Sequence, residues 1–365
     1  MDIIRARLES IACFTVASGG SVPHDEPVTS QPGPRTLADR VADLTAAAGY
    51  SPDDPYVIGV QLHEAPPVFV AGGRTRDDEP LDPRTVVYTA SFAKQVTAVC
   101  AALLVREGRL DLDDPLVRWM PELPGWAADV RLRHLLSHTS GLPDVATFDE
   151  LEHAGLDRTT AAVVDALVRS DGLVSPPGTE HRYSNVGYVC LAVVLERVTG
   201  RSLADLAHER LFRPLGMTSS RFWSGPAPHP PGAAPLDDAF PAPLSVGDGG
   251  LWSSAADLLR WNLAVDRDAL GVSALVRTPG RLDDGTPLDY AWGVGVRDHE
   301  GRPVHRHGAR WAGLCGQLVR LDGEGSLVVL ALDDDEDRAS ALADALLAEL
   351  AERTGPVDPE GPLGD

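Results

Sequence analysis

The chain has 365 residues, of which 43% are hydrophobic, and its formal net charge is −22. This hydrophobic fraction is typical of a globular protein, and the length suits one large domain or two interleaved ones. The negative charge argues against nucleic acid and anionic membrane surfaces as partners, and no apolar run reaches the length of a membrane span.

The first 35 residues are expected to form a disordered or weakly structured leader. Residues 18–36 are rich in Gly, Pro, Ser and Asp, a composition that favours a linker. The apolar run Ile11–Ala17 is short, and Asp2 and Glu9 spoil the basic flank that a secretory signal needs. We therefore expect a cytoplasmic protein and keep secretion as the alternative.

The first predicted elements are one helix and a hairpin. An amphipathic pattern predicts a helix over residues 36–48. Alternating apolar residues then predict two strands, residues 56–62 and 67–71. A β-rich run, Thr85–Tyr88, follows and leads into an almost wholly apolar helical run, Ser91–Leu104.

Ser91 and Lys94 stand together at the start of that helical run. Residues three apart lie on one face of a helix, so the two side chains are expected to be neighbours. A serine hydroxyl needs a nearby base, and a lysine amine can be that base only if burial lowers its pKa from about 10.4 towards 7. Lys94 is the only lysine among 32 basic residues. The alternative is that Ser91 caps the helix and Lys94 lies on its surface.

The cysteines and histidines do not predict a metal site. Cys100 and Cys190 fall within apolar helical runs and are expected to be buried thiols, without a disulfide framework. His134 and His138 are four residues apart, as in some metal sites, but no acidic third ligand is placed nearby. We therefore expect neither metal nor cofactor.

The middle of the chain is mainly helical. The predicted helices are residues 130–138, 159–169, 186–198, 202–213 and 254–265. The last third changes to short runs with strand character, residues 292–296, 303–307, 315–321 and 326–332, before a helix that Ser340 would cap. Strands at both ends with helices between them predict an α+β fold, with an antiparallel sheet from both termini and an inserted helical domain.

This order predicts a division into domains. The predicted parts are a leader (1–35), a sheet domain (36–110 and 286–353), a mainly helical domain (111–285) and a flexible tail (354–365).

Two further stretches strengthen the Ser91-x-x-Lys94 motif. Tyr183-Ser184-Asn185 precedes an apolar helix, and His307-Gly308-Ala309 ends a predicted strand. Together the three stretches resemble the Ser-x-x-Lys, Tyr-x-Asn and Lys/His-x-Gly motifs of the serine β-lactamase and penicillin-binding-protein superfamily. The resemblance runs from about residue 56 to 352 and is to the class C branch with its esterase and D-peptidase relatives.

The resemblance implies a role for each matched residue. Ser91 would be the nucleophile that forms an acyl-enzyme, with Lys94 and Tyr183 as the base; which of the two takes the serine proton is left open. Asn185 would orient Lys94 and contact the substrate. His307, with Gly308, would face the leaving group or a substrate carboxylate, and the backbone N–H groups of Ser91 and Arg310 would form the oxyanion hole.

Ala309 departs from the resemblance, because glycine usually stands at this position. We expect its methyl group to crowd a bulky acyl group more than a small one.

These observations predict a serine hydrolase that acts on carboxylic esters or related small-molecule acyl compounds. The alternatives are a D-Ala-D-Ala-type peptidase, a β-lactamase, a transacylase with the same acyl-enzyme, and a non-catalytic acyl-binding module. The oligomeric state is left open.

Overall fold

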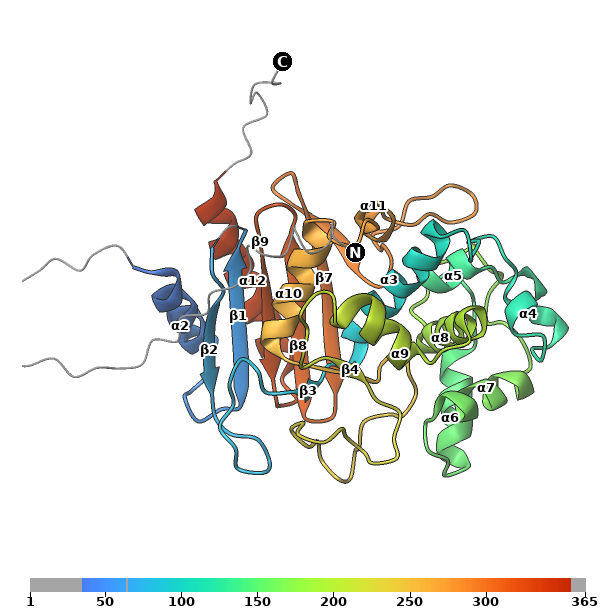
Figure 1. The fold of residues 1–365 in the computed structure, drawn as a ribbon, viewed down its shortest axis with the longest axis horizontal. Helices are drawn as coiled ribbons and strands as arrows, with labels where there is room; N and C mark the ends of the chain where they lie inside the picture. Colours follow the sequence, from blue (N-terminus) through green and yellow to red (C-terminus); the bar gives the residue numbers. More distant parts are fainter. Residues whose placement is uncertain (1–34, 64, 356–365) are drawn as a thin grey trace, which may run out of the picture.

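A six-stranded antiparallel sheet joins the two ends of the described chain (Figure 1). The computed structural model describes residues 35–63 and 65–355. The strands are β1 (Tyr56–Leu62), β2 (Val68–Gly72), β6 (Gly295–His299), β7 (Arg302–Trp311), β8 (Leu314–Leu321) and β9 (Gly325–Ala331). Their order across the sheet is β2-β1-β9-β8-β7-β6. The first hairpin therefore extends a sheet that the end of the chain forms.

Helices cover both faces of this sheet. Helices α2 (Leu37–Ala47) and α12 (Glu336–Thr354) pack on one face, and α10 (Ala255–Asp266) packs on the other (Figure 1). Along β1, Ile58 and Val60 belong to the core under α12, whereas Val57 belongs to the core that includes α10. Successive strand residues point to opposite faces, so β1 serves both cores with one apolar run.

A helical half stands beside the sheet and is centred on α3 (Ala93–Arg106). All residues of α3 from Ala93 to Leu104 are buried, as expected for a helix that is apolar all round. Helices α8, α9 and α11 pack against α3. The helices of this half, besides α3, are α4 (Leu116–Trp119), α5 (Leu132–Leu136), α6 (Asp144–His153), α7 (Thr160–Arg169), α8 (Asn185–Thr199), α9 (Leu203–Ala207) and α11 (Ser273–Arg277).

A second, three-stranded sheet leads the chain into α3. It consists of β3 (Val87–Tyr88), β4 (Arg221–Phe222) and β5 (Leu251–Ser253), in the order β3-β5-β4. The next residue after β3, Thr89, donates both its backbone N–H and its hydroxyl to the Leu251 carbonyl. These bonds fix the backbone two residues before Ser91.

The α+β prediction is confirmed, and several predicted boundaries are corrected. Helix α12 begins at Glu336 rather than near Ser340, because the Asp335 side chain accepts the Arg338 N–H and caps it. The helix expected over residues 130–138 covers Leu132–Leu136, and the backbone at His138 has a positive φ of 55°, outside the helical region. The strand expected at 292–296 is Gly295–His299.

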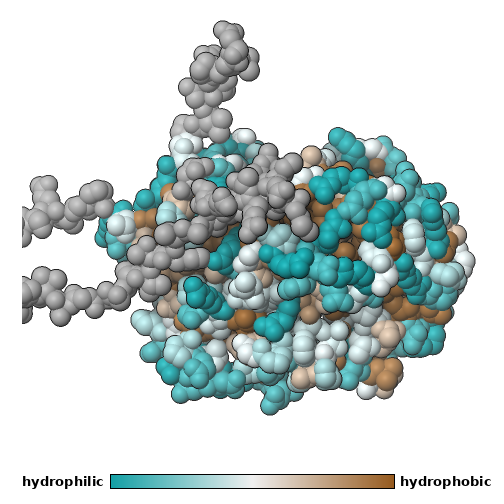
Figure 2. Space-filling view, in the orientation of Figure 1, coloured by the Kyte–Doolittle hydropathy of each residue, from teal (hydrophilic) through white to brown (hydrophobic). Residues whose placement is uncertain are grey.

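The division into domains stays a prediction. Most of the leader and most of the tail lie outside the described residues. Helix α10 packs on the sheet although its residues fall in the range predicted for the helical domain. Within the described ranges, no helix is both long and apolar enough to cross a membrane. Figure 2 shows a face covered largely by hydrophilic residues, in keeping with the net charge of −22.

Gly293, two residues before β6, lies directly against the first turn of α3. Its φ is +76°, and a Cβ there would lie 2.7 Å from the carbonyl carbon of Lys94. Gly301, in the turn between β6 and β7, has a φ of +81°, but a Cβ there would meet nothing within 4 Å. The two glycines therefore differ in steric surroundings and hardly in backbone conformation.

We predict that Gly293→Ala destabilises the protein more than Gly301→Ala. The second change should cost about 1–2 kcal/mol, the ordinary penalty for a left-handed alanine. The first adds a backbone clash and should cost roughly 1–3 kcal/mol more. Urea unfolding of both variants measures the difference, and equal losses would show that α3 and Gly293 are not in close contact.

Candidate active site

Ser91 sits in a short 3-10 turn, Ala90–Phe92, at the entrance to α3. Ala90 has a φ of +42°, a conformation that residues with a Cβ rarely adopt. Phe92 is buried in the core, while Ser91 is partly exposed. Strained backbone conformations occur frequently at active sites, where the surrounding structure holds them in place. The turn thus anchors Phe92 in the core and leaves the preceding residue, Ser91, accessible.

Lys94 is completely buried one turn further into the protein. Its Nζ lies 3.2 Å from Ser91 Oγ, 2.8 Å from Asn185 Oδ1 and 2.7 Å from the Asp248 carbonyl oxygen. These three neighbours match the three donors of an ammonium group. Across the described part of the chain, no carboxylate oxygen forms an ion pair with this amine.

Tyr183 also contacts Ser91. Its hydroxyl lies 3.0 Å from Ser91 Oγ, and the Lys94 Nζ lies 4.9 Å from the centre of its ring. The ring packs against His138, with 4.3 Å between the ring centres, while 39% of the residue stays exposed. The structure therefore brings together Ser91, Lys94 and Tyr183, the predicted nucleophile and the two candidate bases.

Asn185 is the first residue of α8 and binds Lys94 through its side-chain oxygen. Its amide nitrogen lies 3.4 Å from Asp144 Oδ2, and the other oxygen of Asp144 accepts the Val186 N–H at 2.7 Å. Burial raises the pKa of Asp144, while the hydrogen bonds from Val186 and Ser184 oppose that shift. Sequence reasoning missed Asp144, which fixes the orientation of the Asn185 amide.

Sequence reasoning also missed Asp248. Its carbonyl accepts from Lys94, while its carboxylate binds Ser245 Oγ at 3.0 Å and Arg158 at 2.5 Å. A Cβ at Gly247 would lie 2.4 Å from the Tyr188 carbonyl oxygen. A glycine is needed there for this loop to approach α8 and reach the amine.

The third predicted stretch lies on β7, where the sheet has a free edge. Strand β6 pairs with β7 only from Arg302 to Arg306, so residues 307–311 have no partner on that side within the described chain. His307 lies at this edge, with its ring centre 6.1 Å from that of Tyr183. Arg310, whose backbone N–H is the second predicted oxyanion donor, directs its side chain towards Glu336.

Ala309 is a buried residue of β7. It is only 2% exposed and belongs to the core, where its Cβ would lie 3.4 Å from a Cβ at Gly316. The methyl group lies on the same face of β7 as the His307 side chain, because residues two apart in a strand point the same way. That this methyl crowds a bulky acyl group stays a prediction.

His307 belongs to a buried chain of rings that sequence reasoning did not anticipate. Tyr290 OH lies 3.2 Å from His307 Nε2 and 3.1 Å from His138 Nε2. Burial lowers the pKa of His307 to about 4, and the positive charge of Lys94 adds to this effect. Burial, together with the same amine, also lowers the pKa of His138. Both histidines are therefore neutral at pH 7.

We predict that acid destabilises the protein partly through His307. Below pH 6.5 the unfolded chain binds a proton at this histidine, whereas the folded protein does not until about pH 4. The free energy of unfolding should therefore fall as the pH drops through this window and stay level above pH 7. From pH 7 to pH 5 the loss attributable to His307 is about 2 kcal/mol.

Urea unfolding at pH 7 and pH 5 checks this prediction. His307→Gln removes the titrating ring, so its loss between the two pH values should be smaller than that of the wild type by about 2 kcal/mol. The comparison uses the difference between two pH values, so a constant cost of the substitution cancels. Equal losses in the two proteins would contradict the assignment.

Comparison with known proteins places this geometry in a family. The family model described as Beta-lactamase matches residues 45–352. Penicillin-binding protein 4* of Bacillus subtilis (strain 168) is 30% identical over 294 residues, which cover 71% of this chain and 63% of that protein. The chain thus spans less than two thirds of this relative. Esterase EstB of Burkholderia gladioli is 29% identical over 330 residues, covering 69% of this chain and 78% of that protein.

A solved structure agrees with the fold. The crystal structure of a penicillin binding protein from Bacillus halodurans superposes with a TM-score of 0.71 at 24% identity, covering 85% of this chain and 98% of that one. The extent of the family match, together with the contacts among Ser91, Lys94 and Tyr183, leads to one conclusion: the chain belongs to the Beta-lactamase family.

Proposed function

We propose that this protein is a serine hydrolase that cleaves carboxylic esters or related acyl compounds through an acyl-enzyme on Ser91. The observation that carries the proposal is the double contact of Ser91 Oγ, with Lys94 Nζ at 3.2 Å and Tyr183 OH at 3.0 Å. A serine becomes a good nucleophile when an adjacent group takes its proton, and both candidate groups are within reach.

Two arrangements of protons satisfy these contacts. In the first, Tyr183 donates to Ser91 and Ser91 donates to the amine of Lys94, which donates to Asn185 and to the Asp248 carbonyl. In the second, Lys94 donates to Ser91 and Ser91 donates to an ionised Tyr183. In either arrangement Ser91 donates a hydrogen bond to the group that would take its proton.

The reaction then has two steps. Ser91 Oγ attacks the ester carbonyl while its proton passes to the base, and the carbonyl oxygen gains negative charge. We propose that the N–H groups of Ser91 and Arg310 stabilise that charge, as paired backbone donors do in other acyl-transfer enzymes. The C–O bond breaks, the leaving oxygen takes the proton from the base, and water repeats the sequence to release the acid.

The names of the relatives support hydrolysis of acyl compounds without singling out esters, since several relatives are named D-aminopeptidase. One relative is named an esterase, and another is named a penicillin-binding protein. A D-Ala-D-Ala-type peptidase, a β-lactamase or a transacylase would use the same acyl-enzyme with another substrate or acceptor. A non-catalytic binding module would not need Ser91, Lys94, Tyr183 and Asn185 in mutual contact.

We predict that Ser91→Ala abolishes ester cleavage. The loss in kcat should be on the order of a million-fold, as for other nucleophiles that work together with a neighbouring base. Lys94→Arg should fail nearly as badly, because arginine keeps the charge but cannot act as a base. The matched control is Tyr56→Phe, which removes a phenol hydroxyl on the far side of the sheet, under α12. Initial rates on a short-chain p-nitrophenyl ester measure all three variants.

A fluorophosphonate probe and an ester substrate together distinguish an enzyme that turns over from a protein that only forms a stable acyl adduct. The probe should label the wild type and Tyr56→Phe, and it should not label Ser91→Ala. A p-nitrophenyl ester should then give repeated turnover rather than a single burst that stops at one equivalent. Labelling of Ser91→Ala, or a burst without turnover, would contradict the proposed hydrolase.

A further inference from the structure

A directed chain of hydrogen bonds runs from the second motif to the third. The backbone N–H of Ser184 donates to His138 Nδ1 at 3.1 Å. A neutral His138 must therefore carry its proton on Nε2, which lies 3.1 Å from Tyr290 OH. Tyr290 then donates to His307 Nε2 at 3.2 Å, and His307 donates from Nδ1 to the Gly308 carbonyl at 2.6 Å. Each proton in the chain has one position that satisfies every partner.

The direction of this chain fixes the state of His307. Both ring nitrogens already have partners, and His138, Tyr290 and His307 are all buried. A second proton on His307 would occupy Nε2 and leave the buried Tyr290 hydroxyl without an acceptor. Leaving a buried donor unpaired is unfavourable. The groups whose rings or charges face His307 are Tyr183, Tyr290 and Lys94, and no carboxylate is among them to favour an imidazolium.

The other cations near Ser91 also have partners. The amine of Lys94 faces three acceptors. Arg158 binds Asp248, and Arg310 binds Glu336 with 67% of its side chain exposed. Gly308, which follows His307, has no side chain with which to contact a ligand. The chain as a whole carries a net charge of −22, which repels anions approaching from solution.

We propose that the site selects substrates whose leaving group carries no carboxylate, and that Tyr290 and His138 are positioning residues that keep His307 neutral and fully hydrogen-bonded. This inference rests on the proposed ester hydrolysis and names its substrate class. Burying a substrate carboxylate beside Ser91 would leave that charge without a cationic partner, which is unfavourable in a site of low polarity.

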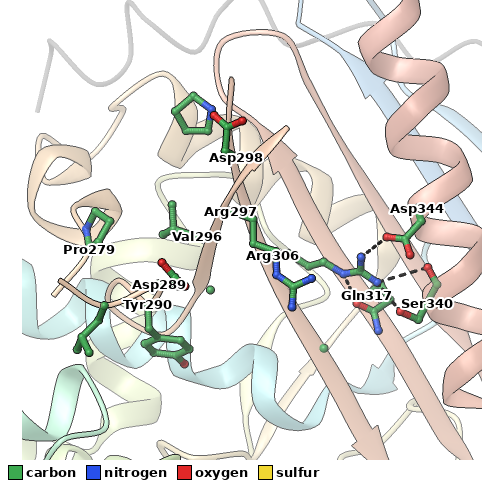
Figure 3. Close-up of a pocket in the computed structure, with 14 residues that line it drawn as sticks. Pro279, Asp289, Tyr290, Val296, Arg297, Asp298, Arg306, Gln317, Ser340 and Asp344 are labelled. Carbon is green, nitrogen blue, oxygen red and sulfur yellow. Dashed lines mark hydrogen bonds and ion pairs between the residues drawn. The ribbon is translucent and has the colours of Figure 1, made fainter. Parts of the chain in front are cut away.

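A groove beside β6 and β7 offers the main alternative source of a cation. Its volume is about 930 Å³, and Tyr290 and Gly308 are among the residues that line it (Figure 3). The Arg306 guanidinium binds Gln317, Ser340 and Asp344 and is therefore already paired (Figure 3). Arg297 also lines the groove; its backbone pairs with that of Val304, which stands three residues, or about 10 Å along the strand, before His307.

The first experiment uses two esters of the same shape and different charge. They are 4-carbamoylphenyl acetate and 4-carboxyphenyl acetate, which share the acyl group and differ in the leaving group. The kcat/KM of each is divided by its hydroxide-catalysed rate constant to remove intrinsic reactivity. At pH 7 the wild type should prefer the amide-bearing ester at least tenfold. A preference for the carboxylate-bearing ester, or equal values, would overturn the proposal.

The second experiment tests the positioning role of Tyr290. Tyr290→Phe removes the hydroxyl that occupies His307 Nε2, so the preference should fall at least threefold, and further at pH 5.5 than at pH 7. Tyr188→Phe is the matched control: its ring lies 5.1 Å from that of His138, and its hydroxyl binds the Leu136 carbonyl instead. The control should keep the wild-type preference, and a merely structural role for Tyr290 would leave the preference unchanged in both variants.

The third experiment does not depend on turnover. Nitrogen-15 NMR of the histidine rings, assigned with His307→Gln and His138→Gln, reports where each proton lies. His307 should be neutral with its proton on Nδ1, and His138 neutral with its proton on Nε2, from pH 8 to pH 5.5. An imidazolium signal for His307 at pH 7 would overturn the proposal.

The outcomes separate this inference from the proposed function. If the rings show the expected protons but neither ester is cleaved, the ester hydrolysis fails and the neutral His307 stands. If the carboxylate-bearing ester is preferred and Arg297→Ala removes that preference, the hydrolysis stands, and the groove supplies the cation that we exclude.

Discussion

The buried amine of Lys94 is the interaction on which the rest of the site depends. Its three neighbours come from separate parts of the chain: Ser91 at the entrance to α3, Asn185 at the start of α8, and Asp248 in the loop before β5. A completely buried polar group is stable only when its hydrogen bonds are made, so each segment must be in place for the others to be favourable. Folding of this region and assembly of the site are therefore one event.

Two acidic residues, Asp144 and Asp248, lie close to this amine, but their carboxylates bind other groups. Asp144 binds the Asn185 amide, and the carboxylate of Asp248 binds Arg158 while only its backbone carbonyl meets Lys94. A direct ion pair would favour the charged form of the lysine. The arrangement instead supplies neutral acceptors to the amine and keeps each carboxylate engaged with another group. The orientation of the Asn185 side chain therefore depends on its contact with Asp144 as much as on its contact with Lys94.

Local sequence patterns predicted the elements that carry the site. The spacing of Ser91 and Lys94 follows from one helical turn, and the apolar run after them predicted the burial of α3. The pairing of a hairpin near the start of the chain with strands near its end also followed from the pattern of short alternating runs. The individual helices and strands were predictable because each depends on residues close together in sequence, whereas the pairing of distant strands followed from the order of the elements.

The missed features depend on contacts between distant segments. Asp144 meets Asn185 across 41 positions, and Tyr290 meets His138 across 152. The strands β4 and β5 contain two and three residues, too few for an alternating pattern. Asp335, which caps α12, lies within a run of acidic residues, 333–337. In each case the role of the residue depends on a partner that the local sequence does not identify.

The distribution of basic residues has a further chemical consequence. The chain uses arginine at 31 positions and lysine at one, and that lysine is completely buried. Reagents that couple to primary amines, such as succinimidyl esters and aldehydes, therefore find no lysine on the described surface. Acyl donors that react with amines without catalysis likewise meet no exposed lysine there, so the described surface offers no lysine to uncatalysed acylation.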